Sequence, residues 1–120
     1  AARQAAAAYY NNAFASCDKL VTPIKSDFTT HVFHQYTLKL QGVDINGLQE
    51  NLKEKGIPAM IYYPVPLHLQ KAYQDPRYKK GDFPVAEKLM ECVLSLPMHT
   101  ELDEEQLAYI TSSVLEFVNK

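Results

Sequence analysis

The sequence predicts a small α+β domain, with about three strands and with helices packed mainly on one face of the sheet. Stretches with apolar residues three and four positions apart, typical of helices, alternate along the chain with short runs of β-branched and aromatic residues, typical of strands. The 120 residues are enough for one hydrophobic core. Because no internal repeat, low-complexity linker or domain boundary divides the chain, we expect residues 1–120 to form a single domain.

The first part of the chain predicts a helix, a loop and a strand. Residues 3–16 are rich in alanine, the strongest helix former. Thr22-Pro23 then interrupts the chain before a polar loop that extends to Thr30. Residues 31–40 nearly alternate in polarity and are rich in β-branched and aromatic side chains, which indicates a strand. The better core face of this strand carries Val32, His34, Tyr36, Leu38 and Leu40.

A second helix with a clear end follows. Asp44 or Asn46 can cap its first turn, and Asn46 with Gln49 has the spacing of a capping box. Gly56, followed by Ile57-Pro58, is a strong signal for helix termination. The apolar stripe of this helix consists of Ile45, Leu48 and Leu52.

Two further short strands are predicted, over Ala59–Tyr62 and Val93–Leu96. Between them, residues 67–82 indicate a loop with a turn or two of helix. Asp82 can cap a helix that has Pro84 in its first turn. The apolar stripe of that helix consists of Val85, Leu89 and Cys92.

The last predicted helix begins at Thr100 or Asp103 and extends to about Val118. The acidic residues at its start suit the positive end of the helix dipole. Its core face carries Leu107, Ile110, Val114 and Phe117.

The composition argues against several classes of partner. The net charge is −2 and there is no basic block, so we do not expect nucleic acid as a partner. No apolar run approaches the roughly 20 residues that span a bilayer, and the alanine-rich start lacks the core of a secretory signal, so we expect no membrane partner. Cys17 and Cys92 are far apart and lack metal-site spacing, which favours free thiols in a reducing cytoplasm.

The chain begins with a sequence that is already helical in composition. Residues 1–10 contain neither an initiator methionine nor a residue suited to cap a helix. We therefore expect this chain to be a piece of a longer protein.

Residues 60–70 form the most informative segment of the sequence. Two prolines hold part of this segment extended, because proline fixes its own φ and restricts the residue before it. Tyr62, Tyr63 and His68 supply hydroxyl, aromatic and imidazole groups, which are the kinds of contact that orient a polar ligand. The alternative interpretation is a surface turn with partly buried tyrosines, since proline-rich loops are common.

No self-contained catalytic or metal site is recognisable in the sequence. His31 and His34 are three positions apart on a predicted strand and so should point to opposite faces. Cys92 lies on an apolar stripe, and the four glycines are too dispersed to form a phosphate-binding loop. What remains is one plausible contact surface, formed by residues 31–36 and residues 62–68.

An ordered set of short motifs covers nearly the whole chain. The set consists of Arg3-Gln4, Thr22-Pro23, residues 31–36 (HVFHQY), 56–58 (GIP), 62–70 (YYPVPLHLQ), 83–87 (FPVAE), 94–97 (LSLP) and 101–106 (ELDEEQ). Each motif is weak alone, but the ordered set is specific. It resembles the carboxy-terminal domain of the DegT/DnrJ/EryC1/StrS-type sugar aminotransferases.

The resemblance implies an enzyme with the type I aminotransferase fold that uses pyridoxal 5′-phosphate. Enzymes of this family transfer an amino group, usually from glutamate, to a keto sugar attached to a nucleotide. The resemblance further implies a role in polysaccharide or surface-glycan biosynthesis and a homodimer. The cofactor lysine and the phosphate-binding residues belong to a large amino-terminal domain, and none of the ten lysines here has a sequence setting that resembles that lysine. We therefore expect no catalytic, cofactor-binding or metal-binding residue in this chain, and no transaminase activity from it alone.

The resemblance also implies which residues face the nucleotide-sugar substrate. Tyr62 and Tyr63 match a His/Tyr-aromatic-Pro position of the family near the substrate at a dimer interface, and Tyr62 stands where many relatives have histidine. His68 matches a frequent histidine in a Pro-x-His-x-Gln stretch.

His31 and Gln35 match a segment that borders the cleft of the family, and we rank both above His34 as substrate contacts. Packing is an equally open interpretation for each. For the whole chain, the open alternative is a non-catalytic α+β ligand-binding or interaction module, suggested by the missing nucleophile, metal cluster and phosphate loop. The codons upstream of Ala1 would discriminate the two, because a lysine-bearing large domain there favours the enzyme.

Overall fold

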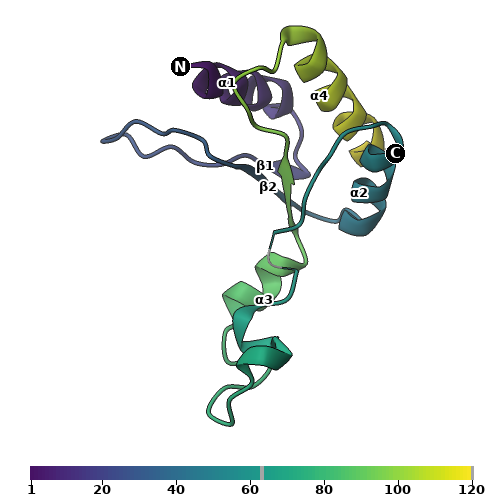
Figure 1. Ribbon diagram of the computed structural model, residues 1–120. Coiled ribbons are helices and arrows are strands. Elements are labelled where there is room, and N and C mark those ends of the chain that lie inside the picture. The colour runs from purple at the N-terminus through teal and green to yellow at the C-terminus, as the bar shows by residue number, and fades with distance from the viewer. Residues whose placement is uncertain (63, 120) are drawn as a thin grey trace.

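The computed structural model describes residues 1–62 and 64–119 of the chain. Three helices, α1, α2 and α4, gather around one end of a small sheet, while α3 lies apart from them (Figure 1). This confirms the predicted α+β class. The elements are α1 (Ala2–Phe14), β1 (Leu20–Val21), β2 (Tyr36–Leu40), α2 (Ile45–Glu54), the short 3₁₀ turns η1 (Leu67–Leu69) and η2 (Lys71–Tyr73), α3 (Pro84–Met90), β3 (Val93–Leu96) and α4 (Glu104–Val118).

The sheet is antiparallel, with β2 between β1 and β3. Thr37 on β2 lies directly opposite Ser95 on β3. Met60 forms a single antiparallel bridge with Ser95, so the predicted strand at residues 59–62 contributes one bridge rather than a full strand. The third strand is instead β1, which lies between the predicted first helix and the loop that begins at Thr22-Pro23, where the sequence predicts no element.

Helices cover one face of the sheet. Helix α4 packs against α1 and α2, and α2 contacts β3. The residues between these helices and the sheet are buried, among them Tyr36, Leu38, Leu94 and Leu96. On the opposite face, Lys39 is exposed and Thr37 is partly buried, because side chains alternate along a strand. Ser95, opposite Thr37 on this face, is buried. Along β2, among the described residues, this face is therefore the more accessible of the two, and we call it the open face.

Helix α1 anchors the core through two tyrosine hydroxyls. Tyr10 is fully buried, its hydroxyl donates to the carbonyl oxygen of Pro97 at 2.7 Å, and its ring lies 4.7 Å from that of Tyr36. The Tyr36 hydroxyl donates to Oδ1 of Asn11 at 2.6 Å. Burial raises the pKa of both tyrosines above the ordinary value of 10.0, and for Tyr36 the neighbouring Tyr10 adds to the increase.

Helix α2 ends as the sequence predicts. Gly56 adopts a φ of 79°, its N–H donates to Lys53 O, and the N–H of Ile57 donates to Leu52 O. This pair of bonds is the Schellman motif, which satisfies carbonyl groups left over at a helix end. The start of α2 differs from the prediction, because the Gln49 side chain donates to Ala59 O at 3.1 Å instead of completing a capping box.

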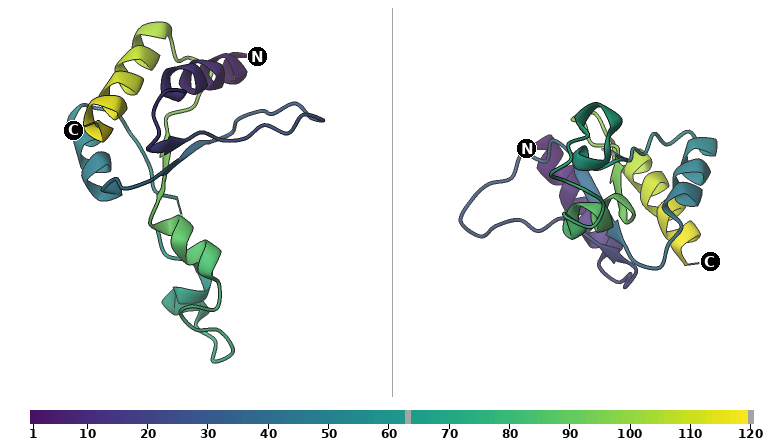
Figure 2. Two further views of the ribbon diagram at one scale, coloured as in Figure 1. Left: turned by 180° about the vertical axis from the view of Figure 1, so that it is seen from behind. Right: turned by 90° about the horizontal axis from the view of Figure 1, so that it is seen from below.

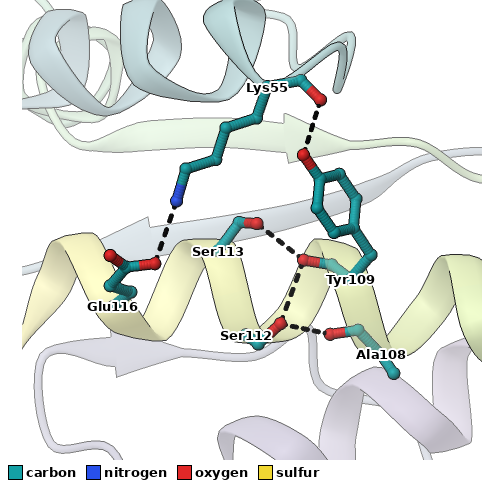
Figure 3. Close-up of polar contacts among 6 residues, drawn as sticks. All are labelled: Lys55, Ala108, Tyr109, Ser112, Ser113 and Glu116. Carbon is teal, nitrogen blue, oxygen red and sulfur yellow. Dashed lines mark hydrogen bonds and ion pairs between the residues drawn. The ribbon is translucent and has the colours of Figure 1, made fainter.

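Helix α4 begins at a capping box, in agreement with one of the two predicted starts. The Asp103 carboxylate accepts from the Gln106 N–H at 2.7 Å, and the Gln106 side chain accepts from the Asp103 N–H at 3.1 Å. The helix is tied to the end of α2, where Lys55 forms a 3.0 Å ion pair with Glu116 and its carbonyl oxygen accepts from the Tyr109 hydroxyl at 2.9 Å (Figure 3). Of the predicted core face, Leu107, Ile110 and Val114 are buried and Phe117 is half-buried.

The predicted strand over residues 31–40 begins only at Tyr36. Phe33 adopts a φ of 51°, in the left-handed region that is unusual for an aromatic residue. This single residue breaks the two-residue alternation of a strand, so the prediction that Val32 and His34 lie on the core face is wrong. Val32 is 72% exposed and His34 is exposed, whereas Phe33 is only 6% exposed.

The region of α3 also differs from its predicted pattern. Val85, placed on the apolar stripe from the sequence, is 71% exposed, while Leu89 and Cys92 are partly buried. The Asp82 carboxylate accepts from the N–H of Lys79 at 2.9 Å rather than from the first turn of the helix. Helix α3 therefore makes few core contacts through its first turn.

Candidate functional site

Two segments project from the body of the molecule. We call residues 22–35, between β1 and β2, the arm, and residues 64–92, which carry η1, η2 and α3, the lobe (Figures 1 and 2). On the arm, Ile24 and Phe28 are 88% and 93% exposed. The predicted contact surface involves the bases of both projections, next to the open face of the sheet.

Helix α1 holds the base of the arm in a defined conformation. One guanidinium nitrogen of Arg3, Nη1, donates to the carbonyl oxygens of Phe33 and His34 at 3.1 and 3.0 Å. The Gln4 side chain donates to the carbonyl oxygen of His31 at 3.0 Å. These three bonds surround the left-handed Phe33, and a strained residue of this kind persists only where its surroundings fix it.

The His31 imidazole takes part in the same arrangement. Its Nδ1 accepts from the N–H of Phe33 at 2.9 Å, and the two rings stack with centroids 4.0 Å apart. Because Nδ1 is the acceptor, the hydrogen-bond network assigns the proton of the neutral imidazole to Nε2. His31, His34 and Gln35 line one hollow of about 360 Å³ at the arm base, which we call the arm hollow. The prediction that His31 and His34 face opposite sides is wrong, since residues 31–35 are not a strand.

A second hollow lies on the open face of the sheet. It has a volume of about 160 Å³, and we call it the sheet hollow. Gln35 and Thr37 line it from the arm base and β2, Met60 and Tyr62 from the start of the proline segment, and Ser95 from β3. Tyr62 is 45% exposed, and its side chain is thus within reach of a ligand from solvent.

His68 lies in the lobe, in a largely buried setting. Its side chain is 8% exposed, and its ring lies 4.7 Å from that of Phe83. Nε2 lies 3.7 Å from Oε2 of Glu87 and has no hydrogen-bond partner in the part of the chain that the structure describes. Both Glu87 oxygens accept from the N–H of Gly81, at 2.9 and 2.8 Å, so Glu87 joins the loop before α3 to the histidine.

The lobe surface carries several charges near His68. Lys79 and Lys80 line a hollow of about 540 Å³ together with His68 and Asp75. The Asp75 carboxylate is paired with Arg77 at 2.8 Å, and hydrogen bonds from Arg77 hold the pKa of Asp75 below its usual value. This lobe hollow is therefore the most cationic of the hollows described here.

The structure brings together some of the predicted substrate residues and separates others. Gln35 lines both the arm hollow, with His31, and the sheet hollow, with Tyr62. His68 lines the lobe hollow and an adjoining apolar hollow, and neither includes His31, Gln35 or Tyr62. Tyr63, also predicted to contact the substrate, lies outside the described residues.

Several residues that shape the site were not recognised as such in the sequence. Arg3 fixes the arm base, Thr37 and Ser95 line the sheet hollow, and Glu87 adjoins His68. Arg3 and Glu87 belong to motifs that the sequence analysis singled out, but their roles depend on partners 30 and 19 residues away along the chain. The pairing of Thr37 with Ser95 depends on the strand register.

The described residues do not by themselves fit pyridoxal phosphate. Eight of the nine lysines within them are exposed, and the partly buried Lys55 is paired with Glu116. A lysine that binds this cofactor covalently needs a sheltered pocket with groups for the phosphate and the ring. Within residues 1–62 and 64–119, no three His, Cys, Asp or Glu side chains are grouped so as to hold a metal ion. Among the same residues, no helix is long and apolar enough to cross a membrane.

Comparison with known proteins identifies relatives of this chain. It is 49% identical, over 83% of its length, to the "Pleiotropic regulatory protein" of Geobacillus stearothermophilus. It is 45% identical, over 70% of its length, to "UDP-N-acetyl-3-dehydro-alpha-D-glucosamine 3-aminotranferase" of Acidithiobacillus ferrooxidans. It covers 26% and 22% of these two proteins, respectively. The chain thus spans about a quarter of the length of these curated relatives.

A solved structure shows the same fold. The crystal structure of DesV from S. venezuelae superimposes on 98% of this chain with a TM-score of 0.89 and 30% sequence identity, and the match covers 31% of DesV. The sequence pattern of one aminotransferase family matches residues 1–115. The fold and the sequence agree, and the chain belongs to the DegT/DnrJ/EryC1/StrS aminotransferase family.

Proposed function

We propose that residues 1–120 are the small carboxy-terminal domain of a pyridoxal-phosphate-dependent aminotransferase. The whole enzyme transfers an amino group from glutamate to a keto sugar attached to a nucleotide, in polysaccharide or surface-glycan biosynthesis. It acts in the cytoplasm as a homodimer. Family membership supports this proposal, as does a relative named as a 3-aminotransferase of a UDP-linked keto sugar.

In this proposal the chain supplies substrate contacts, while the rest of the protein holds the cofactor. When bound, pyridoxal phosphate supplies the electron sink for amino transfer. The exposed lysines of this chain are poorly suited to bind it, as described above. This chain alone is therefore inactive.

The observation that carries the proposal is the convergence of Tyr62 and Gln35 on one hollow. The two side chains come from segments 27 positions apart, and each can donate and accept hydrogen bonds. His31 adds a donor at Nε2 in the neighbouring arm hollow. A sugar nucleotide has hydroxyls, ring oxygens and phosphates that such groups recognise. We assign Tyr62, Gln35, His31, His68 and Tyr63 to substrate binding.

The proposed function is tested on the full-length gene product and on residues 1–120 in parallel. After addition of pyridoxal phosphate and removal of the excess, the full-length protein should retain the visible absorbance of a covalently bound cofactor, and residues 1–120 should not. Glutamate should then bleach this absorbance. A full-length protein that retains no cofactor contradicts the enzyme and leaves a binding module.

A further inference from the structure

The open face of the sheet carries a pair of hydroxyls in direct contact. Thr37 Oγ1 and Ser95 Oγ lie 2.7 Å apart, on residues that face each other across β2 and β3. Ser95 is only 5% exposed and Thr37 is partly buried, so this contact is partly sheltered from solvent. Both residues line the sheet hollow.

One O–H group of the pair is not used in the hydrogen bond between the two hydroxyls. Two hydroxyls carry two O–H groups, and the hydrogen bond between them uses one. The other O–H has no acceptor among the residues that the structure describes. A donor that is partly sheltered from water and has no protein acceptor carries a free-energy penalty, which a ligand oxygen in the hollow would reduce.

The remaining walls of the sheet hollow define the chemistry of that ligand. Met60 and Val93 provide apolar surface, and Gln35 and Tyr62 provide polar groups. None of the described residues that line this hollow carries a formal charge. A diphosphate would lack a cationic partner here, whereas a sugar ring offers C–H faces to the apolar wall and oxygens to the hydroxyls.

We propose that the Thr37–Ser95 hydroxyl pair is a sugar-reading subsite, in which the unused O–H donates to an oxygen of the substrate sugar. This inference rests on the proposed function and adds to it the part of the substrate that is recognised here. Selectivity follows from the same donor, because a ligand without an oxygen at that position leaves a sheltered O–H unpaired. The subsite therefore distinguishes a nucleotide sugar from the nucleotide alone.

The test uses the full-length gene product and four commercial probes: UDP-glucose, UDP, dTDP-glucose and dTDP. Dissociation constants are measured by calorimetry for the wild type and for the double variant Thr37→Val/Ser95→Ala, which removes both hydroxyls. The double variant is needed because in a single variant the surviving hydroxyl can turn to the ligand. The matched control is Thr111→Val/Ser113→Ala, which removes two α4 hydroxyls that donate to carbonyl oxygens of their own helix.

The quantity that decides is the dissociation constant of the nucleotide sugar divided by that of its nucleotide. We expect this ratio to rise about two- to tenfold in the Thr37→Val/Ser95→Ala variant, the effect of one neutral hydrogen bond. It should stay at the wild-type value in the control and in Thr37→Ser, which retains the hydroxyl. A dissociation constant for the nucleotide alone that matches the wild-type value shows that a variant is folded.

An unchanged ratio in the double variant overturns the subsite, and so does an equal loss of affinity for sugar and nucleotide. Failure of wild-type protein to bind either nucleotide sugar also overturns it, since both probes carry the hydroxyls that the pair should read. The proposed function is judged separately, from cofactor retention and glutamate-dependent bleaching by the wild type. Loss of the subsite alone therefore leaves the aminotransferase intact.

Discussion

Arg3 on α1 donates a hydrogen bond to the carbonyl oxygen of Phe33, 30 residues further along the chain, at 3.1 Å. Phe33 is the non-glycine residue with a positive φ among those described, and the same guanidinium nitrogen also holds the carbonyl oxygen of His34. The first helix thus fixes the base of the arm, where the predicted substrate residues His31 and Gln35 lie. A residue outside the hollows determines the shape of their lining.

Replacing Arg3 with methionine should release the arm base. We expect the free energy of unfolding to fall by about 1–2 kcal/mol, because a charged donor to two backbone carbonyls is lost. Urea denaturation measures this change, and hydrogen exchange of the Phe33 amide should accelerate. The control is Arg77→Met, which removes an exposed pair with Asp75 and should change stability much less than the Arg3 substitution, because solvent screens the pair. Equal effects of the two substitutions would show that Arg3 is not a structural clamp.

The two helix starts at Asp44 and Asp103 offer a matched comparison. Asp103 accepts from the N–H of Gln106, whereas Asp44 occupies the same position before α2 without a side-chain capping bond. We expect Asp103→Ala to lower the free energy of unfolding by about 1 kcal/mol and Asp103→Ser to preserve it. Asp44→Ala should lower the free energy of unfolding by only about a few tenths of a kcal/mol. Equal losses of stability for Asp44→Ala and Asp103→Ala in thermal or urea unfolding would show that the capping bond of Asp103 does not stabilise α4.

The end of α2 depends on the backbone of Gly56. Its φ of 79° costs an L-residue energy, although open space surrounds the position where a Cβ would lie. We expect Gly56→Ala to destabilise the chain by about 1 kcal/mol, and Gly56→Asn to cost less, because asparagine tolerates the left-handed region. Unfolding in urea separates the two. If alanine and asparagine have the same effect, backbone strain is not the cause.

Burial of Tyr10 and Tyr36 gives the chain a sensitivity to alkaline pH. Their pKa values are raised in the folded state, so an unfolded chain releases these two protons first as the pH rises past the ordinary value of 10.0. The stabilisation is therefore complete below about pH 10 and declines above it, by about 1.4 kcal/mol per pH unit for each tyrosine.

The double variant Tyr10→Phe/Tyr36→Phe tests this alkaline sensitivity. It should be less stable than the wild type at neutral pH, because the hydrogen bonds to Pro97 and Asn11 are lost. Its free energy of unfolding should nevertheless change less steeply between pH 9 and 11, a range that brackets the ordinary tyrosine pKa of about 10. Unfolding curves across this range measure both effects. A double variant with the wild-type slope would assign the alkaline loss to other groups.

The helices with local signals were the most predictable part of the fold. The apolar stripe and glycine stop of α2 are encoded within a few residues, and the structure confirms both. For α4 the structure confirms Asp103, one of the two predicted starts. β1 has only two residues and is formed by pairing with β2. A strand this short has no local sequence pattern that could predict it. The left-handed conformation of Phe33 likewise depends on contacts with Arg3 and Gln4, which are distant in sequence. Because the sequence does not show this conformation, the alternating pattern of residues 31–40 predicted the wrong face for His34.

The candidate site was predictable in composition but not in geometry. Family motifs selected Tyr62 and Gln35, and the structure places these two on one hollow. Their meeting depends on β-sheet register, as does the contact between Thr37 and Ser95, residues 58 positions apart. His68 lies on the lobe, away from those hollows, and its contact with Glu87 requires α3 to fold back on the proline segment.

The activity proposed for the enzyme of which this chain forms part is the transfer of nitrogen from glutamate to a nucleotide-linked sugar. The most direct measurement supplies the full-length gene product with pyridoxal phosphate, ¹⁵N-labelled glutamate and nucleotide-linked keto sugars, and follows the label by mass spectrometry. We expect ¹⁵N in a nucleotide-linked amino sugar, formed only when the full-length protein is present. A protein that retains the cofactor and reacts with glutamate, yet transfers no label to any nucleotide-linked keto sugar, would contradict it.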